Sequence, residues 1–172
     1  PSWLTLGADG NGSVASQMAE VEPLTHPVDR ADSDLAAILY TSGTTGRPKG
    51  AALTHEGLRA NARSLHGAWH FSADDRLVHG LPIFHVHGLF VALHCAMLSA
   101  IPVRFHRRFD ADAVIDDLAD ATVFMGVPTH YGRLCANERL TPKACASMRL
   151  FTCGSAPLSE AACDAFPARS GP

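Results

Sequence analysis

The chain has 172 residues, of which 47% are hydrophobic, so it is long enough and apolar enough to bury the core of one ordinary globular domain. Its formal net charge of −3 provides no basic field, so we expect neither nucleic acid nor an anionic membrane surface as a partner. The five cysteines show no C-x-x-C spacing, which indicates reduced thiols in a cytoplasmic protein.

The first part of the chain differs in composition from the rest. Residues 1–34 hold several glycines and prolines among small polar residues, and we expect a linker and a partial strand there, with the strand at residues 3–6. From residue 35 onward, short apolar runs alternate with longer amphipathic stretches, which is typical of β-α-β units around a largely parallel sheet. The predicted fold class is therefore α/β, a layered sheet with flanking helices.

The expected elements follow one another regularly after residue 35. Strands are predicted at residues 35–40, 51–53, 76–80, 101–105, 122–126 and 148–153. Helices are predicted at residues 55–69, 89–98, 111–118, 129–136 and 159–166, with the polar starts Thr54, Asp110 and Ser159. The most apolar stretch, residues 88–103, is shorter than the roughly 20 residues that span a bilayer, so we expect no membrane span. Ligands of such sheets bind beyond the carboxyl ends of the strands, so we expect the site in the loops after residues 40, 80, 126 and 153.

One loop has an unusual composition. Directly after the first predicted strand, residues 41–50 read TSGTTGRPKG and carry four hydroxyls, three glycines and two cations. Glycines let backbone N–H groups converge on an anion, hydroxyls add donors, and Lys49 adds a mobile charge, so the loop suits a polyphosphate. The common P-loop is excluded because Lys49 is followed by Gly50 rather than by Ser or Thr. The composition alone also leaves open a flexible surface turn.

Four segments together resemble a known family. The string from Tyr40 to Gly50 resembles the signature loop of the adenylate-forming (acyl-activating, AMP-binding) enzyme superfamily, which includes acyl-CoA synthetases, peptide-synthetase adenylation domains and luciferases. LPIFHVHGL at residues 81–89 resembles the family's P-x-F-H motif, and MGVPT at residues 125–129 resembles the segment that lines the acyl pocket. GSAPL at residues 154–158 resembles the loop near the adenine and acyl groups. The resemblance covers roughly Asp32 to the end of the chain.

The resemblance implies a fold context and a reaction. Residues 35–172 would form a partial AMP-binding (adenylation) domain, a part of the large N-terminal domain, with the small C-terminal domain absent. A carboxylate would attack the α-phosphorus of ATP to give an acyl-adenylate, and coenzyme A would then take the acyl group. ATP, Mg²⁺ and coenzyme A are thus the implied cofactors, with an acid–CoA ligase as the parent enzyme. The isolated chain is expected to be inactive.

The resemblance also assigns roles to individual residues. Lys49 and His85 are the expected catalytic residues. The expected nucleotide-binding residues are Thr41, Ser42, Gly43, Thr44, Thr45, Gly46, Lys49, Gly154, Ser155 and Ala156. The expected substrate-binding residues are His85, His87, Gly126, Arg133 and Ser155. For His87, a purely structural place in the pocket wall is an equal alternative.

We expect no metal ion held by protein ligands. The densest histidine group is His85-Val-His87, and an H-x-H pair places its rings on opposite faces of a strand unless a turn intervenes. No carboxylate or cysteine lies near the pair in the sequence to complete a site.

The matching segments look most similar to malonyl-CoA synthetases, which makes malonate the leading substrate. A second carboxylate requires a cation, by resemblance an arginine on the helix after Gly154, but Asp164 stands about there and Arg169 lies beyond it. Arg133 is the substitute that the sequence offers. Two alternatives stay open, a short- or medium-chain fatty acyl-CoA ligase and a truncated fragment that binds nucleotide without turning it over.

Overall fold

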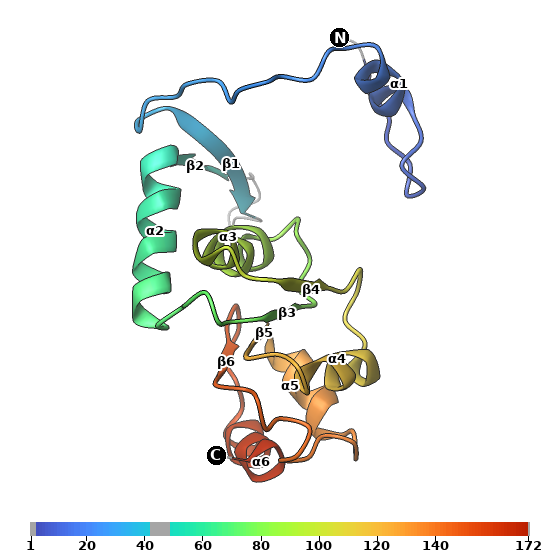
Figure 1. Ribbon diagram of the computed structural model, residues 1–172, viewed down its shortest axis with the longest axis vertical. Coiled ribbons are helices and arrows are strands. Elements are labelled where there is room, and N and C mark those ends of the chain that lie inside the picture. The colour runs from blue at the N-terminus through green and yellow to red at the C-terminus, as the bar shows by residue number, and fades with distance from the viewer. Residues whose placement is uncertain (1–2, 42–48, 172) are drawn as a thin grey trace. The chain divides into compact units, whose positions relative to one another are not determined.

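The computed structural model describes residues 3–41 and 49–171, which fall into two separate units (Figure 1). The first unit ends at Ala31 and holds one short helix, α1 (Ser13–Ala19), none of whose residues is buried. The strand expected at residues 3–6 is wrong, because these residues have no strand partner within residues 3–41 and 49–171 and instead bond to the start of α1, with the Thr5 amide donating to Ser13 Oγ at 2.9 Å.

The second unit, from Asp32 onward, is built around a parallel sheet. Its four strands are β3 (Leu77–His79), β4 (Val103–Phe105), β5 (Val123–Gly126) and β6 (Leu150–Cys153), and they pair in the order β4-β3-β5-β6. All three pairings are parallel, with Leu77 opposite both Val103 and Val123. The α/β fold class predicted from the sequence is confirmed.

Helices cover both faces of this sheet because side chains along each strand alternate between the faces. Val78 and Phe124 pack with the helices α4 (Ala111–Leu118), α5 (Pro128–Cys135) and α6 (Glu160–Ser170). The neighbouring residues Leu77, Val123 and Met125 pack on the other side, against the π-helix η1 (His87–Leu93) and α3 (His94–Ser99). Figure 1 shows α3 on one side of the sheet and α4, α5 and α6 on the other.

The first two strands form a sheet of their own rather than joining the parallel one. β1 (Leu35–Thr41) pairs antiparallel with β2 (Lys49–Thr54), and the helix α2 (His55–Ala68) follows directly. The expectation that these strands belong to β-α-β units is therefore wrong. Only residues 42–48 connect them, and a parallel crossover needs a dozen residues or more.

The polar helix starts predicted from the sequence are confirmed as caps. Thr54 Oγ1 accepts from the Gly57 amide at 3.1 Å, Asp110 Oδ1 from the Ala113 amide at 3.0 Å, and Ser159 Oγ from the Ala162 amide at 3.3 Å. Each cap satisfies an N–H group that would otherwise have no partner at the start of α2, α4 or α6.

A buried ion pair joins the loop before β3 to the start of β6. Asp75 is 2% exposed and accepts from Arg149 Nε at 2.7 Å and from Arg149 Nη2 at 2.5 Å. Thr122 Oγ1 donates to the same carboxylate at 2.7 Å. Because these residues lie at the amino ends of the strands, the cluster fixes the sheet from the side opposite to the loops in which the site is expected.

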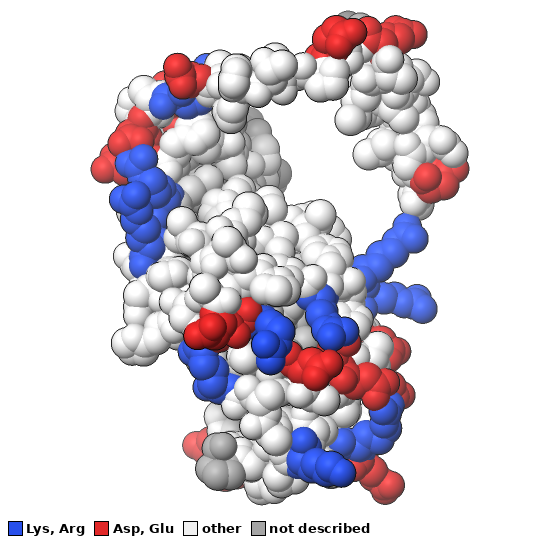
Figure 2. Space-filling view, in the orientation of Figure 1, with Lys and Arg blue, Asp and Glu red and all other residues white. Residues whose placement is uncertain are grey.

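Charged side chains gather in particular regions of the surface. Figure 2 shows basic side chains along α2, which are arginines, with acidic side chains near one end of the helix, and basic and acidic side chains side by side around α4. The second pattern corresponds to exposed ion pairs, such as Arg104 with Asp117 at 3.1 Å and Arg139 with Asp112 at 3.1 Å. In the part of the chain that the structure describes, no helix has the length and apolarity needed to cross a membrane.

Candidate functional site

Loops at the carboxyl ends of β3, β5 and β6 enclose a cavity of about 450 Å³. Its lining residues are Leu81, Pro82, His85, Val86, His87, Gly88, Val127, His130 and Ser155. Three of the predicted site residues, His85, His87 and Ser155, thus line one cavity although they come from two distant segments of the sequence. The carboxyl ends of parallel strands are where ligands bind in this class of sheet.

The contact between His87 and Ser155 fixes one wall of this cavity. His87 Nδ1 lies 3.3 Å from Ser155 Oγ, within hydrogen-bond distance. Ser155 has a φ of +70°, a left-handed conformation that side chains other than glycine rarely adopt. The backbone of Gly154 also lies close to the His87 ring, since a Cβ at Gly154 would be 3.2 Å from His87 Cε1. The His87 ring is therefore held against the loop after β6.

Burial favours the neutral form of His87. Desolvation lowers the pKa of this imidazole below its ordinary value, so the ring is uncharged at neutral pH. A neutral imidazole both donates and accepts, and the hydrogen bond with the Ser155 hydroxyl leaves one ring nitrogen for a ligand.

A tight turn explains why both histidines of the H-x-H segment line the same cavity. The His85 amide donates to the Pro82 carbonyl at 3.2 Å, and the Leu89 amide donates to the His85 carbonyl at 3.0 Å as η1 begins. The two rings are thus not on opposite faces of a strand. His85 is exposed, and its ring lies 4.7 Å from that of Phe84.

Backbone contacts join the ends of β5 and β6. The Gly154 amide donates to the Gly126 carbonyl at 3.2 Å. A side chain at Gly126 would meet Phe124 Cε1 at 2.9 Å and Tyr131 Cε2 at 3.0 Å. A residue with a side chain at this position would therefore force Phe124 or Tyr131 to move. The neighbouring Tyr131 hydroxyl donates to the Thr152 carbonyl at 2.6 Å, which ties α5 to β6.

The predicted phosphate loop is described only at its ends. Ser42, Gly43, Thr44, Thr45 and Gly46 lie outside the described residues. Thr41, the last residue of β1, pairs with Lys49, the first residue of β2, so the expectation that the loop joins two strands is confirmed. Lys49 is exposed.

Six described residues of the predicted site do not line this cavity: Thr41, Lys49, Gly126, Arg133, Gly154 and Ala156. Arg133 is exposed on α5, and Ala156 is exposed in the loop after β6. The two residues that bear on a second carboxylate lie on α6, where Asp164 is exposed and Arg169 donates from Nη2 to the Asn137 carbonyl at 2.9 Å.

Sequence reasoning missed His130, which lines the cavity from α5. Its side chain is 9% exposed and stacks on Phe109, with ring centroids 4.0 Å apart and planes at 4°. Burial, followed by the charge of Arg133 and by His87, lowers the pKa of His130 to about 4, so the ring is neutral. The sequence did hold a signal for His130. The residue directly follows the segment MGVPT, at the start of a helix that comes straight after a buried strand.

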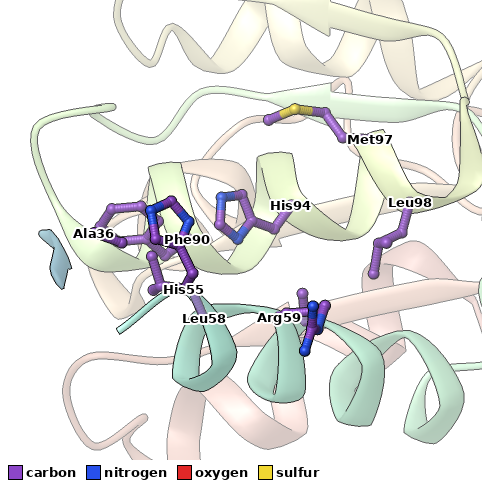
Figure 3. Close-up of a pocket in the computed structure, with 9 residues that line it drawn as sticks. Ala36, His55, Leu58, Arg59, Phe90, His94, Met97 and Leu98 are labelled. Carbon is purple, nitrogen blue, oxygen red and sulfur yellow. The ribbon is translucent and has the colours of Figure 1, made fainter. Parts of the chain in front are cut away.

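A larger cavity of about 490 Å³ contains no predicted site residue (Figure 3). It lies between α2 and the η1–α3 segment, and His55, His94 and Phe90 are among its lining residues (Figure 3). Arg59 is the one arginine among its lining residues, and its Nη2 already pairs with Asp32 Oδ2 at 2.5 Å. Size alone would select this cavity, but the 450 Å³ cavity is the one that gathers the predicted residues at the strand ends, so we take that one as the site. Within residues 3–41 and 49–171, no three His, Cys, Asp or Glu side chains lie close enough to hold a metal ion.

Comparison with known proteins agrees with this geometry. The AMP-binding enzyme family matches residues 5–172. The chain belongs to this family. The match also begins well before Asp32, so the family includes most of the segment in which the sequence alone showed no resemblance.

Individual members of the family differ in substrate. The chain is 36% identical to a malonate–CoA ligase of Arabidopsis thaliana over 73% of its own length and 24% of that protein. It is 34% identical to a feruloyl-CoA synthase of an Amycolatopsis species, over 81% of the chain and 28% of that protein. A crystal structure of ATP-bound MatB from Rhodopseudomonas palustris matches with a TM-score of 0.89 and 47% identity, over 98% of this chain and 33% of that one. The chain thus spans about a quarter to a third of the length of each of these three proteins.

Proposed function

We propose that the chain is the carboxylate- and phosphate-handling part of an ATP-dependent acid–CoA ligase. The observation that carries the proposal is the 450 Å³ cavity in which His85, His87 and Ser155 meet at the carboxyl ends of the strands, in a chain of the AMP-binding family. The cavity combines the neutral imidazoles of His87 and His130 and the Ser155 hydroxyl with apolar walls, and its lining contains no carboxylate side chain. Such a lining admits an anionic substrate without charge repulsion.

The proposed reaction consists of two displacements. In the first, a carboxylate oxygen of the acid bonds to the α-phosphorus of ATP and pyrophosphate leaves. In the second, the sulfur of coenzyme A bonds to the acyl carbon and AMP leaves. Both steps depend on positioned donors and on exclusion of water more than on a strong base. His85 and His87 would orient the reacting carboxylate, while Lys49 and the residues 41–46 would hold the phosphates. Mg²⁺, bound to the triphosphate, would neutralise its charge.

Malonate is the acid that we favour. Support comes from the malonate–CoA ligase of Arabidopsis thaliana and the MatB structure among the similar proteins. A short- or medium-chain fatty acid is the second candidate, favoured by the apolar side chains of Leu81, Val86 and Val127 in the same cavity.

The proposal is tested by carboxylate-dependent exchange of pyrophosphate into ATP in the full-length parent enzyme. Lys49→Ala is expected to lower this exchange about 10- to 100-fold, because it removes a charge-assisted contact to phosphate that contributes about 1.5–3 kcal/mol. Lys143→Ala, which changes another exposed lysine far along the chain, is the matched control and should leave the rate within about twofold. An unchanged rate in the Lys49 variant would remove that residue from the phosphate site.

A further inference from the structure

Two of the five cysteines lie next to the loop that follows β6. Cys153 is the last residue of that strand, and Cys163 lies near the start of α6. Both are exposed free thiols, whereas Cys95 and Cys145 are buried and Cys135 is half-buried. The function proposed above uses neither of the two exposed thiols.

The packing of α6 on β6 directs the two cysteine side chains toward the same space. The Phe151 ring of β6 meets the Phe166 ring of α6 edge to face, with centroids 4.8 Å apart. Cys153 lies two residues beyond Phe151 and therefore on the same face of the strand. Cys163 lies three residues before Phe166 and therefore on the same face of the helix. Both thiols thus lie on the sides of β6 and α6 that face one another.

A shared cavity agrees with this placement. Cys153 and Cys163 both line a space of about 350 Å³, together with Phe151 and Phe166. The two thiols also interact electrostatically, because burial, followed by the negative charge of an ionised Cys163, raises the pKa of Cys153. The pair therefore has two properties of a redox-active dithiol, which are access for an oxidant and a second thiol beside the first.

We propose that Cys153 and Cys163 form an oxidisable dithiol, which a peroxide converts to an intrachain disulfide. With hydrogen peroxide, one thiolate attacks a peroxide oxygen, the O–O bond breaks, and a sulfenic acid and hydroxide result. The second thiol then attacks this sulfur, the S–S bond forms, and the sulfenic oxygen leaves as water. The two sulfurs lose two electrons to the peroxide, and the thiol protons end in the two molecules of water.

The disulfide would act on one wall of the candidate site. The residues between the two cysteines include Ser155, whose φ is +70° and whose Oγ lies 3.3 Å from His87 Nδ1. A disulfide holds its two Cα atoms about 4.4–6.8 Å apart, so it restricts the positions that the loop with Ser155 can adopt. We therefore expect oxidation to lower the ligase activity, an effect that rests on the acid–CoA ligase function proposed above.

The test is oxidation of the full-length parent enzyme with a molar excess of hydrogen peroxide, followed by alkylation and digestion with trypsin. No lysine or arginine lies between Arg149 and Arg169, so residues 150–169 leave as one peptide that contains both cysteines. We expect this peptide to lose the mass of two hydrogen atoms and to take up no alkylating reagent. Dithiothreitol added before alkylation should restore two alkylated cysteines.

Serine variants show which thiols the reaction needs. Cys153→Ser and Cys163→Ser should each abolish the disulfide. Cys135→Ser is the matched control, because Cys135 is a half-buried thiol that does not line this cavity, and the disulfide should form in this variant as in the wild type. Pyrophosphate exchange, measured on the same samples, should fall about 10- to 100-fold in the oxidised wild type, the size of effect that a small misplacement of positioning groups has. Dithiothreitol should restore it.

The peptide and the exchange rate test separate parts of the proposal. A peptide of residues 150–169 that keeps two free thiols after peroxide, or that is joined to a different cysteine, would overturn the dithiol. A disulfide that leaves the exchange rate unchanged would overturn its effect on the site. If the reduced enzyme shows no acid-dependent exchange at all, the proposed function fails, while the mass of the peptide still decides whether the disulfide forms.

Discussion

Arg149→Ala should lower the free energy of unfolding by about 3 kcal/mol, because it leaves the carboxylate of Asp75 buried without its cation. Asp75 is 2% exposed, whereas the Arg149 side chain is 36% exposed, so water reaches the guanidinium but not the acid. The same guanidinium donates to the Trp69 carbonyl at 2.9 Å and to the His70 carbonyl at 3.2 Å. Its removal therefore loosens the loop before β3 as well as the start of β6.

Urea denaturation followed by circular dichroism measures this effect, and Arg139→Ala is the matched control. Arg139 pairs with Asp112 and Asp116 on the surface, where ion pairs contribute at most about 1 kcal/mol. A loss below about 1 kcal/mol in the Arg149 variant would show that the buried pair is not a main support of the sheet.

The same pair gives the direction of a pH effect. Burial alone raises the pKa of Asp75, but hydrogen bonds from Arg149, Thr122 and Ser72 outweigh it and lower the pKa to about 2. The folded pKa lies below the unfolded one, so the stabilisation is present above about pH 4 and is lost as the pH falls toward 2. The Arg149 variant should lose this dependence.

Gly88→Ala should reduce kcat/KM of the full-length enzyme about 100-fold, because misplacement of catalytic groups by about 1 Å has effects of this size. A Cβ at this buried glycine would overlap the carbonyl oxygen of Pro82 and come within 2.9 Å of its carbonyl carbon. Both are backbone atoms of the segment that carries His85 and His87, so the segment must shift to make room. We expect the free energy of unfolding to fall by only about 1–3 kcal/mol, the usual effect of overpacking.

Gly67→Ala is the control for this change, because a Cβ at Gly67 meets no atom within 4 Å. Activity of that variant should match the wild type. Steady-state kinetics and thermal denaturation on both variants separate the two effects. Wild-type kcat/KM in a folded Gly88 variant would show that the turn from Pro82 to His87 does not position the reacting groups.

Much of the secondary structure could be predicted from the sequence, because buried strands are short apolar runs between turn residues. The predicted helix at residues 111–118 coincides with α4, and its cap Asp110 is confirmed. The helix α1 escaped prediction because glycines at positions 10 and 12 precede it and none of its residues is buried. The antiparallel pairing of β1 with β2 was predictable from the short connection between them, but the alternating pattern of the later segments concealed it.

The site was predictable only where a motif carried it. His85, His87 and Ser155 were found through the resemblance of two separate segments, and the structure brings them to one cavity. His130 could not be found this way, because its burial depends on Phe109, which lies on a different segment of the fold. The Asp75–Arg149 pair joins residues 74 positions apart, which no local pattern reveals.

The most direct test of the proposed activity is a comparison of acids as substrates for the full-length parent enzyme. Malonate, acetate, butyrate and octanoate would each be supplied with ATP, Mg²⁺ and coenzyme A, and AMP and acyl-CoA would be measured together. We expect AMP and acyl-CoA to form in equal amounts, with the highest kcat/KM for malonate. Highest efficiency with octanoate would replace malonate by a fatty acid, and AMP formation that does not depend on any added acid would contradict the acid–CoA ligase function itself.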